Sequence, residues 1–147
     1  ELLKIKSRIY QLPVVDLSEV PNSVVDVFVE LPQTDAGSRC AAICAAAIAL
    51  ADAGITMKDM VSAIAVGKVD DKLVVDLNYD EEAYEDGPVA DIPVAMLYNS
   101  KEITLLQMDG EITKEQLLEV LELAKEATGK IAQIQMNAIK DKYRKGE

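Results

Sequence analysis

The stretch Leu31-Pro-Gln-Thr-Asp-Ala-Gly-Ser-Arg-Cys40 decides how this chain is organised. A strand-like run, Ser23–Leu31, ends at a proline, and a polar turn then leads into a long alanine-rich segment with helical character. This order places Gly37, Ser38 and Arg39 at or near a helix N-terminus. Unpaired backbone N–H groups and the helix dipole attract an anion there, and an arginine can bind phosphate oxygens through two hydrogen bonds. The stretch therefore predicts a phosphate-binding turn, although Asp, Gly and Ser also suit ordinary turns and helix caps.

Composition excludes several kinds of chemistry. The chain has 147 residues, which suits one ordinary domain or two small ones that share a core. It contains no histidine, so Ser-His-Asp, Cys-His and histidine-zinc sites cannot be built within it. Cys40 and Cys44 lie one helical turn apart in an apolar background, which predicts buried free thiols. The net charge of −11 argues against nucleic-acid binding by a simple basic surface, so any such role needs basic residues that are focused locally or supplied by another segment or subunit.

Hydrophobic patterns predict a mixed α+β fold. Helices are expected over Glu1–Leu12, Ser38–Ala53 and a long segment that Thr113 and Gln116 open with a capping box. Strands are expected over Val14–Leu17, Ser23–Leu31, Met60–Val69, Lys72–Leu77, Pro93–Tyr98 and Glu102–Met108. The helix at Ser38 is apolar nearly all round, which predicts burial, with Gly54 as its C′ residue. The last helix shows an apolar stripe at Leu117, Val120, Leu121, Ala124, Ala127, Ile131, Ile134 and Ala138.

An acidic segment, Asp80–Gly87, follows the strand that ends near Leu77, and Asp91 lies just before the next expected strand. Such a segment is compatible with a solvated loop. It is also compatible with a Mg²⁺ or Mn²⁺ site, because these hard cations favour carboxylate oxygens together with substrate phosphate. The sequence alone leaves both interpretations open.

Several motifs follow each other in the order and spacing of the RNase PH family. They are Val25–Glu30, Gln33–Arg39, Ala49–Ile55, Ala65–Lys68, Val75–Asn78, Ala90–Ala95 and Ile103–Asp109. The chain therefore resembles this family, and within it most closely the catalytic-type ring subunits of the archaeal RNA exosome. The resemblance implies an α+β fold of RNase PH type, which is the fold of ribosomal protein S5 domain 2. Residues 1–57 would be the C-terminal part of the first domain, and residues 58–147 the complete second domain.

The same resemblance implies a phosphate-dependent 3′→5′ exoribonuclease that releases nucleoside diphosphates. Gly37, Ser38 and Arg39 would bind inorganic phosphate, the co-substrate. Asp91 would be one of two carboxylates that serve as a general acid and as ligands of Mg²⁺ or Mn²⁺. The other would be Glu82, which stands where active family members have Asp, and Glu85 is an alternative because it keeps the spacing to Asp91.

The expected partners are RNA, other RNase PH-like subunits in a hexameric ring and RNA-binding cap subunits. The expected compartment is the cytoplasm, because the sequence shows neither a signal-peptide pattern nor a long apolar run. Family members also have a first half whose arginines hold RNA, so we expect this chain alone to bind RNA weakly and to catalyse little. Two other readings remain: a non-catalytic ring subunit of the same complex, and an acidic α+β binding module unrelated to RNA.

Overall fold

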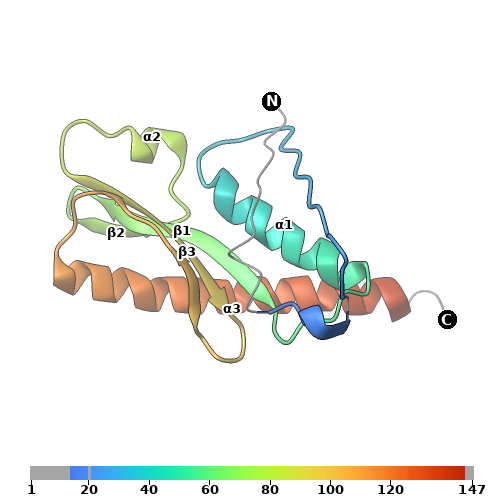
Figure 1. Ribbon diagram of the computed structural model, residues 1–147. Helices are drawn as coiled ribbons and strands as arrows, with labels where there is room; N and C mark the ends of the chain where they lie inside the picture. Colours follow the sequence, from blue (N-terminus) through green and yellow to red (C-terminus); the bar gives the residue numbers. More distant parts are fainter. Residues whose placement is uncertain (1–13, 20, 145–147) are drawn as a thin grey trace.

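The structure is a computed structural model that describes residues 14–19 and 21–144 (Figure 1). Its elements are η1 (Leu17–Glu19), α1 (Ser38–Asp52), β1 (Val61–Val69), β2 (Lys72–Val75), α2 (Tyr79–Glu82), β3 (Val89–Leu97), β4 (Ile103–Leu106), β5 (Asp109–Gly110) and α3 (Lys114–Arg144). This mixture of helices with an antiparallel sheet confirms the α+β class. The helix expected over Glu1–Leu12 lies outside the described residues.

The strands form one five-stranded sheet in the order β2-β1-β3-β4, and all its pairs are antiparallel. Both expected hairpins are present, one turning at Asp70-Asp71 and the other at Asn99–Lys101. β5 also pairs with β3, opposite Ala90 and Asp91, whereas β4 pairs opposite Val94–Met96. β1 occupies the other side of β3, so β4 and β5 lie one after the other along the same side. β3 begins at Val89, so Asp91 lies inside this strand and not before it as the sequence suggested.

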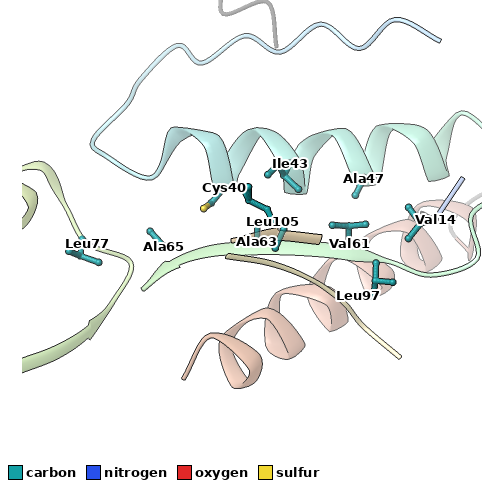
Figure 2. Packing of buried hydrophobic residues seen from close by; sticks show 11 residues of the cluster. Val14, Cys40, Ile43, Ala47, Val61, Ala63, Ala65, Leu77, Leu97 and Leu105 are labelled. Carbon is teal, nitrogen blue, oxygen red and sulfur yellow. The ribbon is translucent and has the colours of Figure 1, made fainter. Parts of the chain in front are cut away.

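Helices cover both faces of the sheet, which separates the core into two clusters. Side chains at alternate positions of β1 point to opposite faces. Val61, Ala63 and Ala65 pack under α1, as Figure 2 shows with Ile43 and Ala47 of that helix. On the other face, Val66 of β1 packs with residues of β3 and α3, listed here together: Ala90, Ile92, Val94, Met96, Val120 and Ala124. The sheet is therefore the middle layer, and its central strands β1 and β3 are the most deeply buried.

α1 ends as the sequence predicted. Gly54 adopts a left-handed conformation (φ 75°), its N–H donates to the Ala51 carbonyl at 3.1 Å, and the Ile55 N–H donates to the Leu50 carbonyl at 3.1 Å. This pair of bonds is the Schellman motif. The expectation that the helix is buried all round is wrong, because Ala41, Ala45 and Ala49 are exposed. The sheet covers only one side of the helix, and no described element covers the other.

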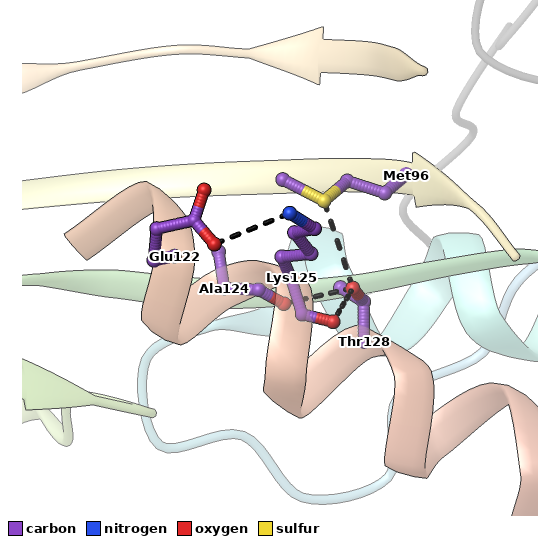
Figure 3. A network of polar contacts seen from close by, with 5 residues as sticks. All are labelled: Met96, Glu122, Ala124, Lys125 and Thr128. Carbon is purple, nitrogen blue, oxygen red and sulfur yellow. Dashed lines mark hydrogen bonds and ion pairs between the residues drawn. The ribbon is translucent and has the colours of Figure 1, made fainter. Parts of the chain in front are cut away.

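α3 begins with the predicted capping box, in which Thr113 and Gln116 exchange hydrogen bonds at 3.2 Å. The helix continues through Gly129 without a break. Its predicted apolar stripe is wrong toward the C-terminus, where Ile134 is 68% exposed and Gln135 is 3% exposed. Polar side chains on the buried side of α3 find hydrogen-bond partners. The Thr128 hydroxyl donates to the Ala124 carbonyl at 2.7 Å and lies near the Met96 sulfur (Figure 3).

The strands expected before α1 are also corrected. Val15 makes only an isolated bridge with Met57, and Leu17–Glu19 is a 3₁₀ turn. Within Ser23–Leu31 the structure has no continuous strand: Val29 alone makes a β-bridge, and Val24 and Phe28 are 81% and 69% exposed. A strand needs successive residues that pair with a neighbour, and a single bridge does not provide this.

Candidate functional site

The turn quoted first does lead into a helix N-terminus. Gly37 is the N-cap residue of α1, with a left-handed backbone (φ 54°) that glycine adopts at little cost. No side chain caps this helix within the described residues. Its first N–H groups, at Ser38 and Arg39, therefore form the positive end of a 15-residue helix.

α2 lies against this turn. The Asn78 side chain and Glu81 form a capping box that starts α2, and the Tyr79 N–H donates to Asp35 Oδ1 at 3.0 Å. Glu82 is the last residue of α2, and the backbone N–H of Gly37 lowers the pKa of its carboxyl. The start of the acidic segment is thus held against the turn that precedes α1, so the segment is not simply a solvated loop.

Asp91 supplies the second carboxylate from β3, where it is paired with Gly67 of β1 and Asp109 of β5. Its Oδ1 atom is buried and has no hydrogen-bond partner among the described residues. Burial raises the pKa of Asp91, the charge of Arg39 lowers it, and the charge of Asp109 raises it further. An unpaired buried acceptor of this kind is costly, so it calls for a proton or a cation.

Glu82 and Asp91 act on each other electrostatically. Burial raises the pKa of Glu82, and the negative charges of Asp91 and Asp35 raise it further, whereas the Gly37 N–H lowers it. Two carboxylates that share a partly desolvated site cannot both ionise without cost. The pair can therefore hold a proton for transfer or share a divalent cation.

Arg39 brings a fixed positive charge to the same place. Its side chain is exposed, and Nη1 donates a hydrogen bond to Oε1 of Gln107, in the connection between β4 and β5. The Gln107 backbone N–H donates in turn to the Pro93 carbonyl of β3 at 3.1 Å. Nothing in the sequence distinguishes Gln107 or Asp109 from other polar residues, because their positions near β3 depend on which strands border it.

The structure thus brings Gly37, Arg39, Glu82 and Asp91 together from three elements that are distant in sequence. Ser38 begins the helix beside them. Glu85, the alternative carboxylate, is exposed, whereas Glu82 is partly buried and Asp91 and Gly37 both affect its pKa. The described residues contain no cluster of three or more acidic or cysteine side chains that could enclose a metal ion. Two carboxylates with one unpaired oxygen still fit Mg²⁺, which commonly takes its remaining ligands from water and substrate phosphate.

The prediction of buried free thiols is confirmed for Cys40, whereas Cys44 is only half-buried. Cys40 and Cys44 are free, and burial raises the pKa of Cys40 to about 12. The Cys44 sulfur accepts the Ala63 N–H at 3.2 Å. These thiols are therefore core residues and not nucleophiles. Among the described helices, none combines the length and the apolar character that crossing a membrane would require.

A helix N-terminus capped by glycine, with carboxylates of α2 and β3 nearby, has the chemistry of a site that could bind an anion and hold a proton. Residues 59–127 match the sequence model of the 3′ exoribonuclease family, domain 2. This match confirms the resemblance to the RNase PH family that the motifs predicted, and it falls in the second domain of that family.

Two archaeal relatives of the chain carry the same name. The chain is 49% identical over 133 residues to "Exosome complex component Rrp41" of Thermococcus gammatolerans, covering 90% of this chain and 52% of that protein. It is 47% identical to the protein of the same name from Pyrococcus horikoshii, with the same coverage. The chain therefore spans about half the length of these relatives.

The fold has a solved counterpart. The crystal structure of rice (Oryza sativa) Rrp46 superposes with a TM-score of 0.66 and 22% sequence identity, covering 77% of this chain and 51% of that one. At this identity the match concerns the fold alone, and it confirms the RNase PH-like architecture expected from the motifs.

Proposed function

We propose that this chain forms part of a phosphate-dependent 3′→5′ exoribonuclease subunit that works in an exosome-type ring with other RNase PH-like subunits. The observation that carries the proposal is the meeting of the α1 N-terminus, Arg39, Glu82 and Asp91 in one place. The names of the relatives, an exosome complex component and a 3′ exoribonuclease family, support an RNA substrate and assembly with other subunits. The hexameric ring and the RNA-binding cap subunits are the finer part of the proposal.

Inorganic phosphate would bind at the N-terminus of α1. The N–H groups of Ser38 and Arg39, the Ser38 hydroxyl and the Arg39 guanidinium supply donors and positive charge of the right kind. The Gly37 N–H lowers the pKa of Glu82, so this carboxylate lies near the proposed phosphate site. Its negative charge makes phosphate binding depend on the position and the protonation of Glu82.

In the reaction, a phosphate oxygen would attack the phosphorus of the 3′-terminal phosphodiester in line. The bond from that phosphorus to the 3′ oxygen of the preceding nucleotide would break, releasing a nucleoside diphosphate and an RNA shortened by one residue. The raised pKa of Asp91 suits a group that gives its proton to the departing oxygen. Arg39 would offset the negative charge gathered around the attacked phosphorus.

A divalent cation would be held by Glu82 and Asp91, and when bound it would supply charge neutralisation on the scissile phosphate. Glu82 has one more methylene than the Asp of active family members. A displacement of about 1 Å costs on the order of a hundredfold in rate, so the α2 anchor at Asp35 and Gly37 must hold this carboxylate in place.

The test uses the full subunit assembled with its ring partners and a single-stranded RNA with a free 3′-hydroxyl. We expect shortening of the RNA only with added inorganic phosphate, and nucleoside diphosphates as products. Asp91→Asn should abolish turnover but keep phosphate binding, whereas Arg39→Ala should weaken phosphate binding. Phosphate binding without any turnover by the unsubstituted complex would identify a non-catalytic ring subunit instead. Nucleoside monophosphates as products would show hydrolysis and refute the phosphorolytic proposal.

A further inference from the structure

We propose that Gln107 is a positioning residue that fixes the Arg39 guanidinium toward phosphate in front of Asp91, without cancelling its charge. This inference rests on the proposed phosphate site and adds a residue to it. It starts from the hydrogen bond that Arg39 Nη1 donates to Gln107 Oε1, between residues 68 positions apart in sequence.

Arg39 needs such a partner. Its side chain is exposed on the first turn of α1, and an arginine that is not held loses much conformational entropy when it binds. Among the described residues, Arg39 makes no ion pair within salt-bridge distance. The carboxamide of Gln107 takes up one Nη1 hydrogen, and the guanidinium has five N–H donors in total. Donors therefore remain for the two parallel hydrogen bonds that an arginine makes with a phosphate.

Gln107 is itself held by the strand that carries Asp91. Its backbone N–H donates to the Pro93 carbonyl at 3.1 Å, and Pro93 lies two residues from Asp91 along β3. Leu105, two residues before Gln107, is buried under α1, so alternation along the chain directs Gln107 to the same face. Strand β3 therefore carries Asp91 and also holds the backbone of Gln107, the residue that orients Arg39.

The chemical type of residue 107 is important. A carboxylate there would also accept from Nη1, but it would pair with the guanidinium as a salt bridge and compete with phosphate for it. An amide orients the guanidinium and leaves its full charge available. The site already holds the carboxylates of Glu82 and Asp91, so a further negative charge would repel phosphate.

The experiment measures two quantities on the full chain: the affinity for inorganic phosphate by calorimetry, and the order of the Arg39 Nε–H group by NMR relaxation. Gln107→Ala should disorder the Arg39 side chain and weaken phosphate binding about five- to tenfold, the effect of losing one hydrogen bond in a charged contact. Gln107→Glu should keep Arg39 ordered and still weaken phosphate binding. A purely structural role would predict that the Glu variant binds as well as the unsubstituted chain. Gln133→Ala is the matched control, because Gln133 is an exposed glutamine on α3 that donates to the Tyr98 hydroxyl at 3.4 Å.

A double-variant cycle tests whether Gln107 acts through Arg39. The pair Arg39→Ala/Gln107→Ala should bind phosphate no more weakly than Arg39→Ala alone. Equal affinity in the unsubstituted chain and Gln107→Ala would overturn the positioning role and leave the phosphate site intact. No phosphate binding by the unsubstituted chain would overturn the site itself, and the positioning role with it. If Gln107→Ala does not fold, the Glu variant decides the matter by the same two measurements.

Discussion

At the scale of single residues, Asp91 shows how a functional group can cost stability. Its Oδ1 atom is buried without a partner, and burial raises its pKa. The folded chain therefore holds the Asp91 proton to a higher pH than the unfolded chain does. As the pH rises through the window from the ordinary pKa to the raised one, the free energy of unfolding therefore falls, because the unfolded chain ionises this carboxyl more readily than the folded chain does.

We therefore expect Asp91→Asn to raise the melting temperature by a few degrees at pH values above that window, where the native carboxylate carries its charge. The gain should vanish in acid below that window, where the native carboxyl is protonated in both states. Thermal unfolding followed by circular dichroism across this pH range is the measurement. Asp86→Asn, at an exposed position, is the control and should change little. A variant that is less stable than the native chain at neutral pH would contradict the argument.

Some site residues could be predicted from the sequence because local structure determines where they lie. Others could not, because their position depends on how the strands pair. Gly37 and Arg39 follow from local chemistry, because a strand, a turn and a helix in that order put them at a helix N-terminus. Glu82 and Asp91 needed the family's spacing to be selected among many acids. Gln107 could not be selected at all, since a single glutamine carries no signal until β4 and β5 are placed beside β3.

At the scale of elements, the ends and centres of helices place opposite demands on glycine. Gly54 closes α1 with φ 75°, a conformation that costs an alanine about 1 kcal/mol or more. Gly129 lies within α3 in ordinary helical geometry, and an added Cβ there meets no atom within 4 Å. We expect Gly54→Ala to lower the unfolding free energy by about 1 kcal/mol, and Gly129→Ala to raise it by about as much. Urea titrations of the two variants provide the comparison, and a shift of the same sign in both would refute it.

A second prediction for elements concerns how α3 is held in register on the sheet. Gln135 is buried, accepts the Ser62 hydroxyl at 2.6 Å, and donates to the carbonyls of Cys44 at 3.0 Å and Val61 at 3.2 Å. One amide therefore joins α3 to both β1 and α1. Gln135→Ala removes the hydrogen bonds to the Ser62 hydroxyl and to these two carbonyls, and it should destabilise the chain by about 2 kcal/mol or more. Gln133→Ala, two residues earlier on the exposed side, should have almost no effect in the same denaturation experiment.

The same residue explains why the α3 stripe was predicted only in part. The sequence marks apolar positions, and a periodic pattern built on them continues to Ile134 and Ala138. In the structure the buried line passes through Thr128, Ala132 and Gln135, because polar side chains that find partners can be buried in place of apolar ones. A pattern of hydrophobicity detects the first half of this helix and cannot detect the second.

At the scale of the whole molecule, apolar sheet edges favour association between copies of the chain, whereas the net negative charge opposes it. The outer strands of the sheet carry exposed apolar side chains, Val75 on β2 (41% exposed) and Ile103 and Leu106 on β4 (44% and 48%). Open strand edges with apolar side chains favour pairing with another sheet. The net charge of −11 repels a second copy of the same chain at long range, and salt screens that repulsion.

We therefore expect the chain to remain monomeric at low salt and to form larger species as the salt concentration rises. Sedimentation velocity over a salt series measures this balance directly. Leu106→Lys places a charge on the β4 edge and should suppress the salt-dependent association. Ile134→Lys, which changes an exposed residue on α3 away from both edges, should leave it unchanged. If high salt dissociates larger species instead, attraction between charged groups and not apolar edges holds the copies together. The candidate site would then belong to an assembly held by charged surfaces and not to one in which sheets of neighbouring copies pair at their edges.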